Sequence, residues 1–322
     1  LHGVGVSCVN ALSVWMEAFV NREGKSYTQR YEKGVPKTKV ECIGETNLHG
    51  TTIRFLPDET IFKEGIRLDY DALRKQIQEL DYLSPGMTFN FKFEDKEQEV
   101  ITSKNGIKDY IDDLNKNKNQ LTSVFYTESM EDRIGVKLAM QYNDTYTDTY
   151  KLYTNSIPNS AGTHLTGFRT ALTQSINEYA RDKKYLKEKD ANISGEELKE
   201  GLTLVLSFIM PDPVFSGQTK DVLSSSEART AVQRLVAKEI KVWLDANPKD
   251  AKAIKDFSSA WSTFAKQADL ENMINETKTD DIVEEISLKV DVKKLYSILN
   301  FFKFATVIIC VQNFFKSGAL FG

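Results

Sequence analysis

The sequence has few of the residue types that build metal centres and disulfide frameworks, with three cysteines and three histidines in 322 residues. Cys8, Cys42 and Cys310 stand far apart and lack the short spacing of a zinc site. Three histidines cannot supply a histidine-rich metal site. Cys8 and Cys42 lie among apolar residues, so we expect reduced thiols in the core of a cytosolic protein.

Glycine and proline are missing from most of the C-terminal third. No glycine occurs between Gln218 and Ser317 and no proline follows Pro248, so helix should dominate there. The apolar end "LYSILNFFKFATVIICVQNFF" is about long enough to span a bilayer. Lys303 and several amides interrupt it, which favours an amphipathic or incidental hydrophobic tail over a membrane span.

Large net charge is also missing. The net charge of −4 argues against a chain whose whole surface coats nucleic acid, although a local basic patch would fit. The hydrophobic content of 41% and charged content of 27% are typical of a globular chain, and the length allows two domains and a tail.

The first hundred residues predict mixed sheet and helix. "SVWMEAFVNREGKSYTQRYEKG" reads as two strands joined at Glu23-Gly24, and "TTIRFLPD" as a third. "MTFNFKFED" would place its three phenylalanines on one face of a strand. "DYDALRKQIQELDYL" predicts a helix with a stripe of Leu73, Ile77 and Leu80.

A second region begins near Ser103 with the helix "NGIKDYIDDLNKNKN" and the strand candidates "LTSVFYT", "IGVKLAMQYN" and "TYKLYTNSI". The long helix that follows carries Leu165, Phe168, Leu172, Ile176 and Tyr179 at helical spacing. "GLTLVLSFIMPDPVF" predicts a buried strand. The pattern Ser224-x-x-Glu227 predicts a capping box before a last helix with Val232, Leu235, Val236, Ile240, Trp243 and Leu244 on one face.

A glycine-spaced turn, Gly3-Val4-Gly5, precedes a predicted helix near the start of the sequence. Glycine lets the backbone approach a ligand, and a helix N-terminus presents free N–H groups with a partial positive charge. The combination is typical of a phosphate site, to which His2 would belong if the loop wraps a triphosphate. An ordinary glycine turn and a surface histidine fit the same residues.

Three further polar residues stand at the ends of predicted strands or in a loop. Thr51 enters the strand "TTIRF" and could bond a base edge, or could simply favour a strand. Lys220 lies in the loop "GQTKDVL", where it could reach a terminal phosphate with Gln218 beside it. A solvated loop lysine is the alternative.

The order of four blocks carries more information than any single residue. "LHGVGVSCVNALS", "HGTTIRFLPD", "GTHLTGFRTALTQSINEYA" and "GQTKDVLSSSEAR" resemble the ATPase region of the B subunit of bacterial type IIA topoisomerases, DNA gyrase and topoisomerase IV. The resemblance runs from Leu1 to about Ile254. It implies an α+β chain. Residues 1–102 would be the C-terminal half of a GHKL ATPase α/β sandwich, residues 103–260 a transducer domain resembling a ribosomal-protein fold, and residues 261–322 a divergent, mostly helical tail without a family match.

The resemblance also implies a site and partners. It assigns His2, Gly3, Val4 and Gly5 to the triphosphate of ATP, Thr51 to adenine, and Gln218 and Lys220 to the γ-phosphate as catalytic residues. The implied activity is that of an ATP-dependent DNA topoisomerase that uses ATP and Mg²⁺. The implied partners are DNA, the topoisomerase A subunit and a second B subunit on ATP binding, in the cytoplasm and without a membrane.

In the family, the catalytic base and the Mg²⁺ ligand precede "LHGVG", and a metal-binding domain follows the transducer. We therefore expect an incomplete fragment that is inactive alone and whose metal ligands lie outside this chain. The alternatives are a non-catalytic transducer or dimerisation module, the product of a truncated or frameshifted gene, and another GHKL protein. The pair "GTHLTGF" and "GQTK" speaks against the last.

Overall fold

The computed structural model describes residues 4–145, 147–256 and 258. The chain forms two compact units and passes from the first to the second between Lys104 and Asn105. Two residues of the predicted phosphate turn, His2 and Gly3, lie outside the described residues, as do Cys310 and the predicted tail.

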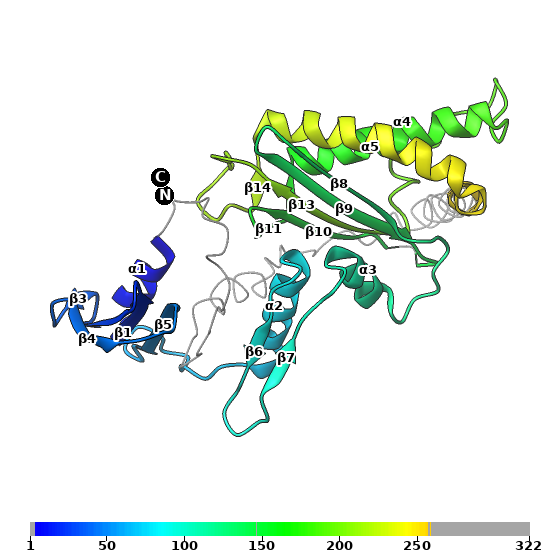
Figure 1. Cartoon of the computed structure of the whole chain (residues 1–322). Coiled ribbons are helices and arrows are strands. Elements are labelled where there is room, and N and C mark those ends of the chain that lie inside the picture. The colour runs from blue at the N-terminus through cyan, green and yellow to red at the C-terminus, as the bar shows by residue number, and fades with distance from the viewer. Residues whose placement is uncertain (1–3, 146, 257, 259–322) are drawn as a thin grey trace, which may run out of the picture. The chain divides into compact units, whose positions relative to one another are not determined.

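The first unit contains a sheet followed by a helix and a small hairpin (Figure 1). Its elements are α1 (Val4–Ala11), β1 (Ser13–Arg22), β2 (Lys25–Glu32), β3 (Val35–Pro36), β4 (Glu41–Glu45), β5 (Gly50–Pro57), α2 (Tyr70–Leu83), β6 (Phe89–Phe91) and β7 (Glu99–Ile101). The five-stranded sheet has the order β3-β2-β1-β5, and β4 also pairs with β2. Glu23 and Gly24 turn the chain between β1 and β2 with positive φ, as two-residue hairpins prefer, which confirms the predicted hairpin.

The predicted face of phenylalanines is confirmed, although β6 ends at Phe91. Phe91 is buried with Leu73 of α2, and the other two phenylalanines of the stretch pack against this cluster. The predicted helix stripe is partly wrong, because Leu80 is 42% exposed. The buried row continues from Leu73 to Asp81 at intervals of four residues, which turns Leu80 away from the hairpin.

The prediction that Cys8 and Cys42 belong to a core is wrong, since both are exposed free thiols. Every residue of β4 is exposed, so Cys42 lies on a strand that nothing described covers. Apolar neighbours along the chain do not reveal which side of a strand or helix is packed.

The second unit is a sheet with two long helices on one face and a short helix on the other (Figure 1). Its elements are α3 (Ile107–Asn115), β8 (Phe125–Glu131), β9 (Ile134–Tyr142), β10 (Thr149–Thr154), β11 (Ile157–Asn159), β12 (Ala161–Gly162), α4 (Thr163–Asp182), β13 (Leu202–Ile209), β14 (Val222–Leu223) and α5 (Ser226–Ala246). The sheet order is β11-β10-β13-β9-β8, with β10 and β13 parallel. The first predicted strand begins later than expected, at Phe125, because residues 121–124 lie outside the ladder with β9.

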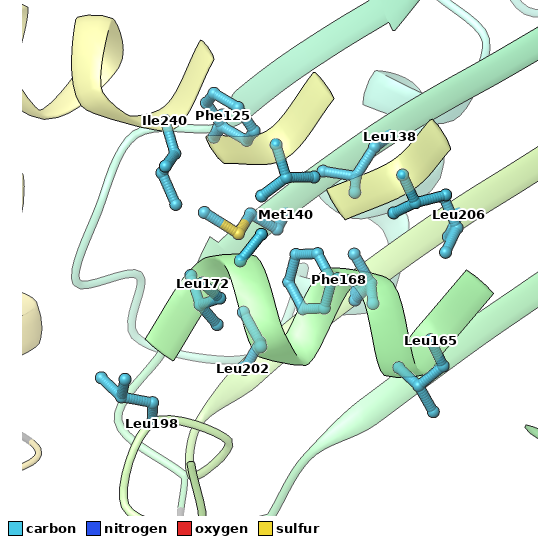
Figure 2. Close-up of a cluster of buried hydrophobic side chains, with 14 of the residues drawn as sticks. Phe125, Leu138, Met140, Leu165, Phe168, Leu172, Leu198, Leu202, Leu206 and Ile240 are labelled. Carbon is cyan, nitrogen blue, oxygen red and sulfur yellow. The ribbon is translucent and has the colours of Figure 1, made fainter. Parts of the chain in front are cut away.

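The core of this unit lies between the sheet and the helix pair. Figure 2 shows Phe168 and Leu172 of α4 grouped with Leu138 and Met140 of β9 and with Ile240 of α5. The predicted apolar faces of both helices are therefore confirmed. Residues 248–256 are helical and add Ala251 and Ile254 to the same core.

A buried polar network fastens α3 to the sheet. Asn115 Nδ2 donates to Gln141 Oε1 at 2.8 Å, and Asn115 Oδ1 accepts from Thr203 Oγ1 at 2.8 Å. Buried polar groups are costly unless they are paired, so this network fixes where α3 can dock.

The predicted capping box is wrong. Helix α5 begins at Ser226, its N-cap is Ser225, and no side chain caps it. The Ser225 hydroxyl instead accepts a hydrogen bond from Val214 N at 2.9 Å, and Ser224 pairs with Ser216. These serines close the preceding loop rather than the helix end.

Candidate functional site

Gln218 and Lys220 lie at the tip of a hairpin-like loop between β13 and α5. Ser216 N donates to Val222 O at 3.0 Å and Ser224 N donates to Val214 O at 2.8 Å, which joins the two sides of the loop. Lys220 N donates to Gly217 O at 3.1 Å and closes the turn. The structure thus brings Gln218 and Lys220 together. Gln218 is exposed and Lys220 is half-buried.

The base of this loop is held by the segment that leads into α4. Strand β14 pairs in parallel with β12, and Thr163 Oγ1 donates to Ser225 O at 2.6 Å. The pairing is close, because a Cβ placed on Gly162 would stand 2.8 Å from both Leu223 and the ring of His164. A side chain at position 162 would push these two groups apart.

His164 is the buried titratable group beneath the loop. It is fully buried, and neither ring nitrogen has a hydrogen-bond partner among the residues that the structure describes. Burial alone lowers the pKa of His164 to about 4 from its ordinary 6.5. The ring is therefore neutral at neutral pH.

Val4 and Gly5 are the first described residues of α1 in the first unit. Val4 is exposed, and a Cβ placed on Gly5 would meet nothing within 4 Å. Among the described residues, nothing therefore lies over Gly5, as an anion site at a helix N-terminus would require.

A corner around Asp58 ties the end of α1 to β5. Asp58 N donates to Leu12 O at 3.0 Å, and the Asp58 carboxylate accepts from Thr60 and pairs with Lys33 at 3.0 Å. Hydrogen bonds from Thr60 and Lys33 lower the pKa of Asp58 to about 2. The carboxylate stays charged at neutral pH and keeps this corner closed.

Thr51 lies on β5, exposed, opposite Val20 of β1. Helix α1 joins β1 at its other end, where Ser13 pairs with Pro57. Thr51 and the C-terminal end of α1 therefore lie at opposite ends of one strand pair in the first unit, whereas Gln218 and Lys220 belong to the second unit.

Sequence reasoning missed Asn159 and Thr154, which hold the Lys220 loop from β10 and β11. Asn159 Nδ2 donates to Lys220 O at 2.8 Å, and Thr154 Oγ1 donates to Asn159 Oδ1 at 2.6 Å. No motif marks either residue. Asn159 and Lys220 are 61 positions apart in the chain, and a single sequence does not reveal a hydrogen bond between residues so far apart.

The described parts of the chain contain no group of three or more His, Cys, Asp or Glu residues that could hold a metal ion. In the same parts, no helix is long and apolar enough to cross a membrane.

Comparison with known proteins identifies the family. The profile described as DNA gyrase B matches residues 106–272, which is more than half of the chain. The chain belongs to the DNA gyrase B family. The DNA gyrase B protein of Bacillus mycoides is 42% identical over 260 residues, which cover 80% of this chain and 64% of the relative. The Thermotoga maritima protein is also 42% identical, over 266 residues that cover 79% of this chain and 41% of the relative.

A solved structure supports the same assignment. The 43K ATPase domain of Thermus thermophilus gyrase B, in complex with an aminocoumarin, is 30% identical with a TM-score of 0.69. The similarity covers 85% of this chain and 75% of that domain. The expected fold class, an α+β chain with the fold of a GHKL ATPase region, is thus confirmed for the described residues. The chain spans less than two thirds of the length of the first two gyrase B relatives.

Proposed function

We propose that this chain is part of the B subunit of an ATP-hydrolysing type II DNA topoisomerase. The intact enzyme would couple ATP binding and hydrolysis to the passage of one DNA duplex through another. Family membership supports this function. The proposed site is supported by one observation: Lys220 lies at the tip of a loop that backbone hydrogen bonds close.

The proposed partners are DNA, the topoisomerase A subunit and a second B subunit, in the cytoplasm. We assign residues 1–102 to the C-terminal half of the ATPase domain and the following region to the transducer. The tail without a family match was expected to cover residues 261–322, but the family match runs to residue 272, so we place the start of that tail after residue 272. The Mg²⁺ ligands and the catalytic base would come from outside this chain.

The proposed roles follow from charge and position. When bound, ATP supplies the phosphoryl group that is transferred to water. His2, Gly3, Val4 and Gly5 would bind the triphosphate through the start of α1, and Thr51 would contact adenine. Lys220 would place a positive charge at the γ-phosphate with Gln218 donating beside it, and this charge would stabilise the transition state.

A lysine from the second unit also makes domain closure depend on the γ-phosphate. ATP would draw the Lys220 loop to the nucleotide, and hydrolysis with phosphate release would remove that contact. This is a ligand-held switch between two arrangements of the same chain.

The test is ATP turnover by the chain joined to the preceding part of the ATPase domain. Lys220→Ala should lower turnover by about a hundredfold and leave ADP affinity unchanged, because ADP lacks the γ-phosphate. Lys184→Ala is the matched control, since Lys184 is also a loop lysine with positive φ.

Equal losses of ATP and ADP affinity would indicate a folding defect, and no loss at all would remove Lys220 from the site. The 322-residue chain alone should not hydrolyse ATP. A joined protein that binds ATP without turning it over would favour the alternative of a non-catalytic transducer or dimerisation module.

A further inference from the structure

The backbone of Lys220 adopts a conformation that lysine rarely takes. Its φ is +59°, in the left-handed region, where the Cβ of an L-residue crowds the following carbonyl oxygen. A residue in this conformation is disfavoured unless its surroundings stabilise it. The direction of the Lys220 side chain depends on this conformation, because φ and ψ set the Cα–Cβ vector.

A short segment before α4 stabilises the chain at and after Lys220. Ser160 N donates to Asp221 O at 2.8 Å, and β12 continues this contact as a parallel ladder with β14. Lys220 lies just before that ladder begins. Its carbonyl oxygen has a side-chain donor instead, the Nδ2 of Asn159 at 2.8 Å.

The Asn159 side chain is itself fixed. Its Oδ1 accepts from the hydroxyl of Thr154, which is fully buried at the end of β10. Since a carbonyl oxygen only accepts, the amide nitrogen of Asn159 must face Lys220. Both ends of the amide are therefore used, and the side chain joins the sheet to the Lys220 loop.

We propose that Asn159 is a positioning residue for Lys220. Through one hydrogen bond to the Lys220 carbonyl, it keeps the lysine in its left-handed conformation and aims the ammonium group. The consequence for catalysis rests on the proposed contact between Lys220 and the γ-phosphate. The effect on the loop itself does not.

The first experiment measures the loop in the 322-residue chain without nucleotide. Trypsin cleaves after lysine, so the rate of cutting between Lys220 and Asp221 reports how often this turn opens. Asn159→Asp replaces the donor by a second oxygen and should raise that rate by about tenfold, the effect of one lost hydrogen bond. Cutting after Lys184, the other loop lysine with positive φ, should not change.

Thr154→Val provides a second variant that leaves the loop and Asn159 in place. It removes the hydroxyl that orients the amide, so it should accelerate cutting at Lys220 by a smaller factor than Asn159→Asp. Equal acceleration at Lys184 and Lys220, or none at Lys220 in either variant, would overturn the proposal.

The second experiment is a double-mutant cycle on ATP turnover in the joined protein. Asn159→Asp should lower kcat about tenfold without changing ADP affinity, and it should have no further effect in the Lys220→Ala background. A further tenfold loss in that background would show that Asn159 does not act through Lys220. If trypsin shows the loosened loop but Lys220→Ala leaves turnover unchanged, the γ-phosphate role fails while the positioning of the loop stands.

Discussion

Replacing His164 by leucine should remove much of the pH dependence of stability between pH 5 and 7.5. In the folded chain the ring is buried without a hydrogen-bond partner among the described residues, and its pKa is about 4. In the unfolded chain it returns to about 6.5. Between these values the unfolded chain binds a proton that the folded chain does not, so the free energy of unfolding falls as the pH falls.

The magnitude follows from the two pKa values. Their difference corresponds to about 3 kcal/mol of unfolding free energy, at about 1.4 kcal/mol for each pH unit. About 2 kcal/mol of this should be lost between pH 7.5 and pH 5. Below about pH 4.5, carboxylates stabilised by ion pairs, such as Glu178 with Lys241, add losses of their own, so the measurement stays above that range.

The assay is urea unfolding of the wild-type chain and His164→Leu at several pH values from 5 to 7.5. The unfolding free energy of the variant should depend less steeply on pH, by up to one bound proton, because the two proteins share every other titratable group. Identical slopes would show that His164 ionises normally in the folded chain. The packing of its ring beside Gly162 and Leu223 would then be wrong.

Gly167→Ala should destabilise the chain by about 2 kcal/mol or more, because the added Cβ would collide with the backbone of α5, whereas Gly217→Ala, with an open environment, should change the unfolding temperature little. Truncation near Asp256 should leave thermal unfolding by circular dichroism nearly unchanged and reduce light scattering, because the core of the second unit already buries the apolar faces of α4 and α5 together with Ile254; unfolding many degrees earlier would make the removed segment part of the fold. Cys8 and Cys42 should both react rapidly with a thiol reagent in the native chain because both are exposed, and protection of either one would show that it is covered.

The sequence predicts well what depends on short-range pattern. The Glu23-Gly24 hairpin follows from turn chemistry, and the buried face of α4 follows from helical spacing. Both are decided by residues within a few positions of one another. The family resemblance rests on the same kind of evidence, because its blocks are contiguous.

The predictions that were wrong, and the residue that was missed, depend on contacts between segments far apart in the sequence. Leu80 is exposed because the hairpin packed on α2 covers the neighbouring row of residues. Ser225 is the N-cap residue of α5, but its hydroxyl does not cap the helix, because it accepts a hydrogen bond from Val214 N on the other side of the loop. Asn159 donates a hydrogen bond to the carbonyl of Lys220, which lies far away in the sequence, and the residues next to either one do not predict this bond.

The contact at Gly167 has a mechanical consequence. Because Gly167 has no side chain, α4 packs directly against the backbone of Arg229 in α5. Near the other end of the two helices, Tyr179 OH of α4 donates a hydrogen bond to Leu244 O of α5 at 3.1 Å. Helices α4 and α5 are thus held together near both ends, so a tilt of one would carry the other with it. Helix α4 is about 30 Å long, from its 20 residues, so a tilt of about 5° at the Lys220 loop moves its far end by roughly 2.6 Å. A small movement at the Lys220 loop, one that leaves its hydrogen bonds intact, would therefore become a larger displacement at the opposite end of the helix pair.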